Sequence, residues 1–112
     1  MKRTLERRLA DVEGFRDPSA ALEQYPTPAE LAAHLLHLAD LHGDLADRTV
    51  ADLGTGTGML ALGAATRDPR RVVAIERDAD ALAVARENES RVDPEVSVDW
   101  LRGDATAPPL RT

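Results

Sequence analysis

Leucine and valine recur at helical spacing near the start of the chain, between Thr4 and Glu13. Their positions follow an i, i+4, i+7 pattern at Leu5, Leu9 and Val12. The pattern predicts a short amphipathic helix that Gly14 ends. Residues 15–25 have no clear period and include a proline, so we expect an ordered arm or loop there.

A second helix is predicted to begin at Thr27. Thr27 can cap the helix, Pro28 suits its first position, and Glu30 can complete a capping box. Gly43 is expected to end this helix. Between these limits four leucines share one face, at Leu31, Leu35, Leu38 and Leu41.

The rest of the chain alternates short apolar runs with helical segments. Buried strands are predicted at Thr49–Leu53 and Arg71–Glu76, and a half-exposed third strand at Val96–Leu101. The segments between them, Met59–Thr66 and Asp78 to about Arg91, are predicted helices, and Asp78 can cap the second. Four residues of that helix are expected to face the hydrophobic core, namely Ala81, Leu82, Val84 and Ala85.

Strands that alternate with helices predict parallel β-α-β units with right-handed crossovers. We therefore expect an α/β fold with a doubly wound parallel sheet. Such sheets normally have about five strands or more, with the first near the middle, whereas this sequence supplies three. One side of the first strand would then have no partner, as in the front half of a domain.

Composition excludes several classes of protein. The 112 residues include no cysteine, which excludes a disulfide scaffold and a cysteine-based zinc site within the chain. No apolar run approaches the roughly 18 residues of a membrane span, and the charged N-terminus is unlike a signal peptide. We expect a soluble, cytoplasmic protein.

The formal net charge of −6 argues against strong binding of a nucleic-acid backbone by this chain alone. High salt weakens that argument, because it screens the electrostatic interaction. The preference for Arg over Lys and the many Asp fit either a salt-loaded cytoplasm or a GC-rich coding bias.

The strongest chemical signal is the segment Asp52-Leu53-Gly54-Thr55-Gly56-Thr57-Gly58. A strand here delivers a glycine-rich turn to a helix N-terminus, where a ligand can approach bare backbone amides. From Gly56 to Ala61 the sequence fits the dinucleotide fingerprint G-x-G-x-x-G/A. The whole segment instead fits the acid and three glycines of S-adenosylmethionine methyltransferases, which uses every glycine. A P-loop is excluded because no Gly-Lys-Ser/Thr follows.

Two further acids follow strands at the same edge of the predicted sheet. Glu76 ends the second strand, and both nucleotide interpretations assign such an acid to the ribose hydroxyls. Asp104 comes after the third strand, where an acceptor can meet an adenine amino group or simply form a turn. Because these features follow three successive strands, they point to one crevice.

The chain resembles the class I methyltransferases, and closely resembles the N-terminal half of the methyltransferase-like protein 5 family, including its archaeal members. The block Leu22-Glu23-Gln24-Tyr25-Pro26-Thr27 is specific to this family, whereas the glycine motif is shared by a whole superfamily. The match runs over nearly the whole chain. Its other segments are Leu5-Glu6-x-x-Leu9, Val12-Glu13-Gly14-Phe15, Val50–Gly58, Asp78–Leu82 and Gly103-Asp104-Ala105.

The resemblance implies methylation of the N6 amine of an adenine in small-subunit ribosomal RNA, with S-adenosylmethionine as the cofactor. It implies that residues 1–48 form a helical arm that caps the cofactor and that residues 49–112 form a partial Rossmann-like binding domain. The implied cofactor-binding residues are Gln24, Thr27, Gly54, Gly56, Thr57, Met59, Glu76, Asp104 and Ala105. Gln24 and Thr27 would reach the cofactor from the arm. Gly54, Thr57 and Met59 would surround its methionine part, Glu76 would hold the ribose, and Asp104 and Ala105 would border the adenine. A helix cap at Thr27 and ordinary core packing at Met59 are competing interpretations.

The family carries a catalytic Asn-Pro-Pro-Phe motif at the end of a fourth strand, and this sequence contains no such motif. We therefore expect no catalytic residue and no metal ligand in the chain. The segment Ala107-Pro108-Pro109-Leu110 has alanine and leucine where asparagine and the aromatic residue are needed, and is interpreted as a turn. The resemblance also implies a partner, a small zinc-binding methyltransferase activator that adds a strand beside residues 96–101.

Three functions remain open at this point. The favoured one is the cofactor-binding half of an RNA adenine-N6 methyltransferase. The second is a catalytically inactive, truncated cofactor-binding module. The third, least favoured, is a fragment of a nicotinamide-dependent oxidoreductase. Binding of S-adenosylmethionine against NAD separates the third from the others.

Overall fold

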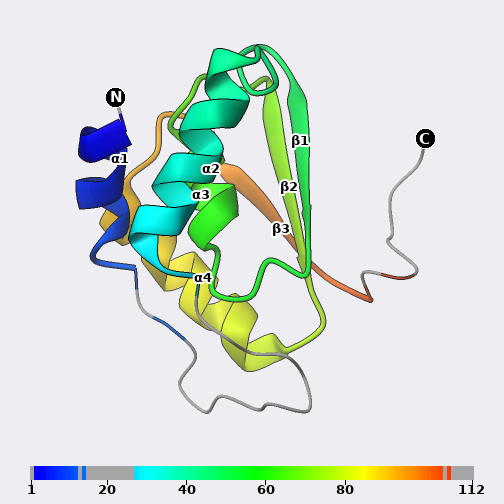
Figure 1. The fold of residues 1–112 in the computed structure, drawn as a ribbon. Coiled ribbons are helices and arrows are strands. Elements are labelled where there is room, and N and C mark those ends of the chain that lie inside the picture. The colour runs from blue at the N-terminus through cyan, green and yellow to red at the C-terminus, as the bar shows by residue number, and fades with distance from the viewer. Residues whose placement is uncertain (1, 13, 15–26, 105, 107–112) are drawn as a thin grey trace.

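The computed structural model describes residues 2–12, 14, 27–104 and 106. In that part of the chain, four helices and three strands follow one another (Figure 1). They are α1 (Lys2–Leu9), α2 (Ala29–Leu41), β1 (Thr49–Leu53), α3 (Met59–Ala65), β2 (Arg71–Glu76), α4 (Ala79–Val92) and β3 (Val98–Arg102).

The strands form a parallel sheet in the order β1-β2-β3 within the described residues. Ala51 of β1 lies opposite Val73 of β2, and Ala74 of β2 lies opposite Trp100 of β3. This confirms the predicted α/β fold, and the predicted bounds of β1 and β2 are confirmed as well. β1 is at one edge of the described sheet, and the helices lie against one face of it (Figure 1).

The hydrophobic core lies between the helices and this face of the sheet. α3 and α4 pack on the strands, and α1 and α2 pack against α3. Small residues in α3 allow α2 to approach closely, since a Cβ atom on Gly63 would overlap the Leu36 side chain. The residues predicted to turn inward from α4 are confirmed as buried, namely Ala81, Leu82, Val84 and Ala85.

The two N-terminal helices differ from the prediction at their ends. α1 ends at Leu9, before the predicted Gly14, because the chain turns there and the Val12 amide donates to the Leu9 carbonyl at 3.1 Å. α2 has Pro28 as its N-cap and no side-chain capping hydrogen bond within the described part of the chain. The predicted cap at Thr27 and the capping box are therefore wrong. Pro28 is still extended (φ −60°, ψ 141°), which moves the first helical turn beyond the reach expected of Thr27.

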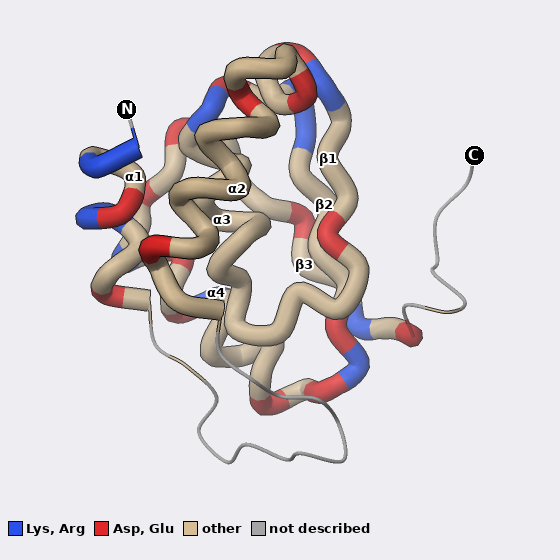
Figure 2. The backbone as a smooth tube through the Cα atoms, in the orientation of Figure 1, with Lys and Arg blue, Asp and Glu red and all other residues tan. Residues whose placement is uncertain are grey.

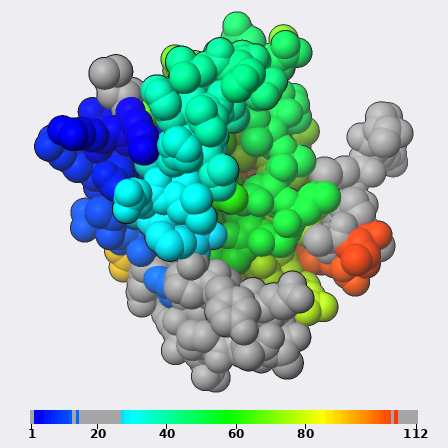
Figure 3. Space-filling view, viewed as in Figure 1, coloured from blue at the N-terminus to red at the C-terminus, as the bar shows by residue number. Residues whose placement is uncertain are grey.

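The leucine stripe of α2 lies on the open side of that helix. The exposed fractions are 48% for Leu31, 46% for Leu35, 41% for Leu38 and 70% for Leu41. The buried residues are instead Ala32, Ala33 and Leu36, and the Leu36 side chain occupies the space that Gly63 of α3 leaves open. An amphipathic pattern normally places its leucines against the core, so α2 reverses the usual arrangement. Figure 3 shows α2 open at the surface along its length.

β1 was predicted to be buried, and this is wrong. Exposed and half-buried positions alternate along it, because a strand at the edge of the described sheet has a neighbour on one side only. β3 is partly exposed, as predicted, but begins at Val98 rather than Val96. The Val96 amide donates to the carbonyl of Ala65 at 3.3 Å, which ties that residue to the end of α3 instead of to the sheet.

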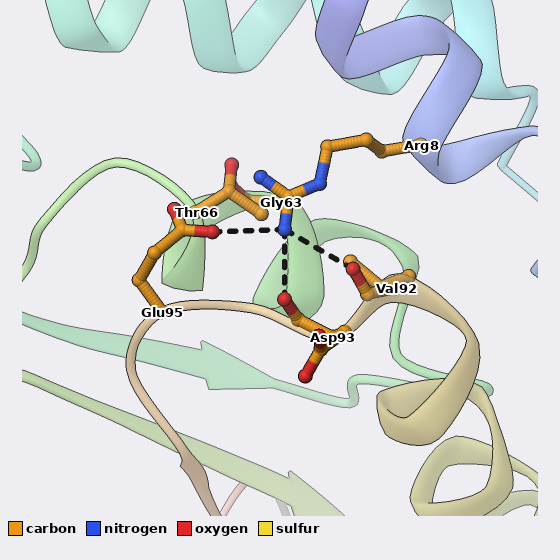
Figure 4. Close-up of polar contacts among 6 residues, drawn as sticks. All are labelled: Arg8, Gly63, Thr66, Val92, Asp93 and Glu95. Atoms are coloured by element: carbon orange, nitrogen blue, oxygen red, sulfur yellow. Dashed lines mark hydrogen bonds and ion pairs between the residues drawn. The ribbon is translucent and has the colours of Figure 1, made fainter.

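α1 is attached to the far end of α4 by Arg8. One guanidinium nitrogen, Nη2, donates to the carbonyls of Val92 (3.1 Å) and Asp93 (2.8 Å) and to Oε1 of Glu95 (2.9 Å) (Figure 4). The last carbonyls of a helix have no partner within the helix, and a cation there also interacts favourably with the helix dipole. Arg8 therefore caps α4 from a position more than eighty residues earlier in the sequence.

Charged residues are spread over α1, α4 and the loops, whereas α3 carries none (Figure 2). None of the helices in the described ranges is long and apolar enough to cross a membrane.

Candidate functional site

The glycine-rich turn of residues 54–58 joins β1 to α3 and continues the sheet ladder. The amides of Gly54 and Thr55 both donate to the Ile75 carbonyl of β2, at 2.8 and 2.9 Å. The Gly58 amide then donates to the Thr55 carbonyl at 3.0 Å and closes the turn. The turn is thus fixed to β2 at its start and to itself at its end.

Gly58 is required by both backbone conformation and space. Its φ is +92°, and an added Cβ would lie 2.8 Å from Cη2 of Trp100 and 3.3 Å from Ala85. Gly54 also has a positive φ of +78°, yet nothing in the described part of the chain lies within 4 Å of a Cβ built there. The turn is therefore packed against β3 and α4 at Gly58 and open at Gly54.

Glu76, the last residue of β2, bridges two of the segments predicted to form one crevice. Its Oε1 accepts a hydrogen bond from the Gly56 amide at 2.8 Å, and its Oε2 accepts one from the Asp78 amide at 2.9 Å. The carbonyl of Glu76 accepts from the Gly103 amide at 3.1 Å. The structure thus brings the ends of all three described strands to one edge of the sheet.

Asp52 lies beneath the turn. Its Oδ2 accepts a hydrogen bond from the Thr55 hydroxyl at 2.7 Å. Burial raises the pKa of the Asp52 carboxyl above its usual 3.8; the bond from Thr55 opposes this, and the nearby Glu76 carboxylate adds to it. Asp52 therefore stabilises the first half of the turn through its bond with Thr55. Ionisation of its carboxyl costs more free energy there than in water.

Asp104 forms a local turn. Its Oδ1 accepts hydrogen bonds from the amide and the hydroxyl of Thr106, at 2.9 and 2.8 Å, and these bonds lower the pKa of its carboxyl. The interpretation of Asp104 as a turn residue is thus confirmed, and a role in ligand binding is a separate question. Of the other residues implied by the family resemblance, Met59 begins α3 and packs partly buried on the core, and Thr27 is half-buried. Gln24 and Ala105 lie outside the described residues.

Sequence reasoning missed the residues that hold the turn from behind. Asn88 of α4 is fully buried, and its Nδ2 donates to the Thr57 carbonyl at 2.9 Å. Trp100 of β3 packs against Gly58, and its Nε1 donates to Glu89 at 3.3 Å. A signal for Asn88 was present, because it follows the inward positions of α4 at helical spacing although it is polar.

An open hollow of about 500 Å³ lies beside Glu76, at the ends of β2 and β3. It is lined by Arg77, Asp78, Ala79, Asp80 and Arg102. The Arg102 guanidinium donates to the Arg77 carbonyl at 3.3 Å, which fixes one wall. Among the described residues, no group of three or more His, Cys, Asp or Glu side chains lies close enough together to hold a metal ion. The lining of the hollow therefore carries two carboxylates, Asp78 and Asp80, and two cations, Arg77 and Arg102.

Comparison with known proteins gives a consistent set of matches. The family described as methyltransferase small domain matches residues 31–110. The rRNA N(6)-adenosine-methyltransferase Mettl5 of Drosophila melanogaster is 38% identical over 103 residues, which cover 91% of this chain and 48% of that protein. Its counterpart METTL5 of Danio rerio is 41% identical over 85 residues, covering 75% and 41% respectively.

Among solved structures, a candidate RNA methyltransferase from Pyrococcus horikoshii superposes with a TM-score of 0.83 at 38% identity. The match covers 92% of this chain and 51% of that one. The chain thus spans about half the length of these relatives, or somewhat less.

Proposed function

Because the chain belongs to the methyltransferase small domain family, we propose that it is the cofactor-binding half of an S-adenosylmethionine-dependent enzyme that methylates the N6 amine of an adenine in small-subunit ribosomal RNA. The family supports the cofactor, and the two rRNA N(6)-adenosine-methyltransferase relatives support the substrate. The observation that carries the proposal is the bridge that Glu76 makes between the glycine turn and the start of α4.

The residues at this edge fit the cofactor chemically. Each oxygen of Glu76 accepts one backbone amide, and a carboxylate oxygen has a further lone pair for a ribose hydroxyl. Gly54 leaves room for close approach of the methionine part, beside Gly56, Thr57 and Met59. When bound, S-adenosylmethionine supplies an electrophilic methyl group on a sulfonium cation. Asp52 and Glu76 would supply negative charge toward that cation.

The adenine of the cofactor would occupy the hollow beside Glu76, with Asp104 and Ala105 at its border. Residues 1–48 would supply the capping arm, with Gln24 and Thr27 facing the cofactor. Thr27 fits this role better than a capping role, because the N-cap position of α2 belongs to Pro28. None of the residues in this sequence is proposed as catalytic.

A partner at β3 is part of the same proposal. β3 pairs with β2 on one side within the described sheet, so its other side offers backbone groups for strand addition by a small zinc-binding activator subunit. Mixing the two proteins should slow hydrogen exchange of the β3 amides. Protection confined to other elements would move the docking site away from β3.

Calorimetric titration of the 112-residue protein tests the cofactor. Measurable binding of S-adenosylmethionine, with no binding of NAD under the same conditions, is the expected result. Binding of NAD alone would replace the proposal by a nicotinamide-dependent oxidoreductase, since residues from Gly56 to Ala61 also fit a dinucleotide fingerprint. Binding of neither would reject both.

A further inference from the structure

Asn88 is a polar side chain in an apolar setting. Its exposed fraction is 0%, and it shares the inner face of α4 with Val84, Ala85 and Val92. Burying a polar group costs free energy unless its hydrogen bonds are made inside the protein. The partners of Asn88 therefore indicate why a polar residue stands at this position.

Those partners fix the orientation of the amide. Arg91 Nη1 donates to Oδ1 of Asn88 at 2.8 Å, and Nδ2 of Asn88 donates to the Thr57 carbonyl at 2.9 Å. A guanidinium can only donate and a carbonyl can only accept. The opposite orientation of the amide would lose both bonds, so Asn88 has one way to bond to the glycine turn.

The bond reaches a peptide of the turn that is held at both ends. The Thr57 carbonyl is held by Asn88, and the amide of the same peptide, on Gly58, donates to the Thr55 carbonyl at 3.0 Å. Trp100 lies against Gly58 from β3. This side of the turn is thus fixed by α4 and β3, while the Gly54 side remains open for a ligand.

We propose that Asn88 is a positioning residue for the cofactor, which fixes the Thr57–Gly58 peptide and thereby the conformation of the glycine turn without touching the ligand. The proposal rests on the proposed function for its ligand, S-adenosylmethionine. Without the bond from Asn88 the Thr57 carbonyl loses that partner, and the peptide keeps only the bond from its Gly58 amide to the Thr55 carbonyl. The turn must then be ordered at the moment of binding, which lowers affinity.

Asn88→Asp is the sharpest variant, because it keeps the size of the side chain and the acceptor for Arg91 but loses the donor to Thr57 when ionised. By calorimetry we expect S-adenosylmethionine to bind about tenfold more weakly, the ratio that corresponds to one lost hydrogen bond. Val92→Ala is the matched control. Val92 is buried one turn further along α4, away from the glycine turn, so this change should lower the melting temperature without changing the dissociation constant.

A second readout needs no ligand. The chain has one tryptophan, and its ring lies against Gly58. Acrylamide should quench its fluorescence more strongly in Asn88→Asp and in Asn88→Ala than in wild type or in Val92→Ala. This comparison tests the holding of the turn even if the wild-type protein binds no S-adenosylmethionine, an outcome that would reject the proposed function alone.

Wild-type affinity and quenching in a folded Asn88 variant would overturn the proposal. So would a failure of both Asn88 variants to fold, because the residue would then serve the fold as a whole and not the turn.

Discussion

The Glu76 carboxylate accepts a hydrogen bond of 2.8 Å from the Gly56 amide, twenty residues earlier in the sequence. Its other oxygen accepts from Asp78, at the N-cap of α4. One side chain thus joins the turn after β1 to the turn after β2. In the proposed function the same carboxylate also holds the ribose, so its removal should affect both the turn and the ligand.

Glu76→Ala should weaken binding of S-adenosylmethionine by about 1.5–3 kcal/mol, the range for hydrogen bonds to a charged group. Calorimetry measures this directly. Asp99→Ala is the control, because Asp99 is an exposed carboxylate of β3 that pairs with Arg71 at 2.7 Å, away from the turn. A dissociation constant that Glu76→Ala leaves unchanged would reject the ribose role.

Asp52→Asn should stabilise the protein relative to wild type increasingly as pH rises above the usual 3.8 toward the raised pKa of Asp52. Burial raises the pKa of this carboxyl above its usual 3.8 in the folded protein. The folded state therefore keeps the proton more readily than the unfolded state, and wild-type stability falls as pH rises through the raised pKa. The amide of asparagine carries no charge, and its oxygen can still accept a hydrogen bond from the Thr55 hydroxyl. The difference in melting temperature between variant and wild type, measured across this range, should grow with pH. A difference independent of pH would contradict the prediction.

Arg8→Ala should lower the free energy of unfolding by about 1–2 kcal/mol, since charged hydrogen bonds to the last carbonyls of α4 are lost. Urea denaturation gives the value. Arg7→Ala removes the same charge from an exposed position of α1 and serves as the control. Equal effects of the two changes would show that the contacts of Arg8 with Val92, Asp93 and Glu95 contribute nothing measurable.

The glycine turn and Glu76 could be predicted because their signals are local. The spacing of Asp52, Gly54, Gly56 and Gly58 defines a strand that ends in a tight turn, and parallel strands bring their carboxyl ends to one edge. Arg8 and Asn88 could not be assigned in this way. Their partners lie 84 and 31 residues away, and no periodic pattern encodes a contact between such distant segments.

α2 shows where a local rule gives the wrong answer. Its leucine stripe lies on the exposed face of the helix. The buried face instead carries Ala32, Ala33 and Leu36. Leu36 packs there against Gly63 of α3. At Thr27 the capping pattern fits the sequence, but the extended Pro28 takes the N-cap position. In both cases a neighbour in space or in the chain decides between two arrangements that the sequence pattern allows.

The 112-residue protein should transfer no methyl group to RNA. Its sequence lacks the Asn-Pro-Pro-Phe that the family resemblance implies for orienting and stacking the target adenine. Radiolabelled methyl transfer to small-subunit RNA is the assay, with the Drosophila melanogaster relative as a positive control. Any transfer above background would place catalytic residues within this chain.

The same protein should self-associate through β1 and the leucine stripe of α2. β1 pairs on one side within the described sheet, Leu53 at its end is 49% exposed, and the stripe is 41–70% exposed. A strand with one unpaired side within the described sheet and a row of exposed leucines are both surfaces through which copies can bind one another. Sedimentation should show mass that rises with concentration. The double variant Leu35→Gln and Leu38→Gln should reduce it without lowering the melting temperature, because these side chains are not buried. Leu9→Ala, by contrast, should lower the melting temperature by emptying a fully buried position. A wild-type monomer at every concentration would show that these surfaces do not bind one another.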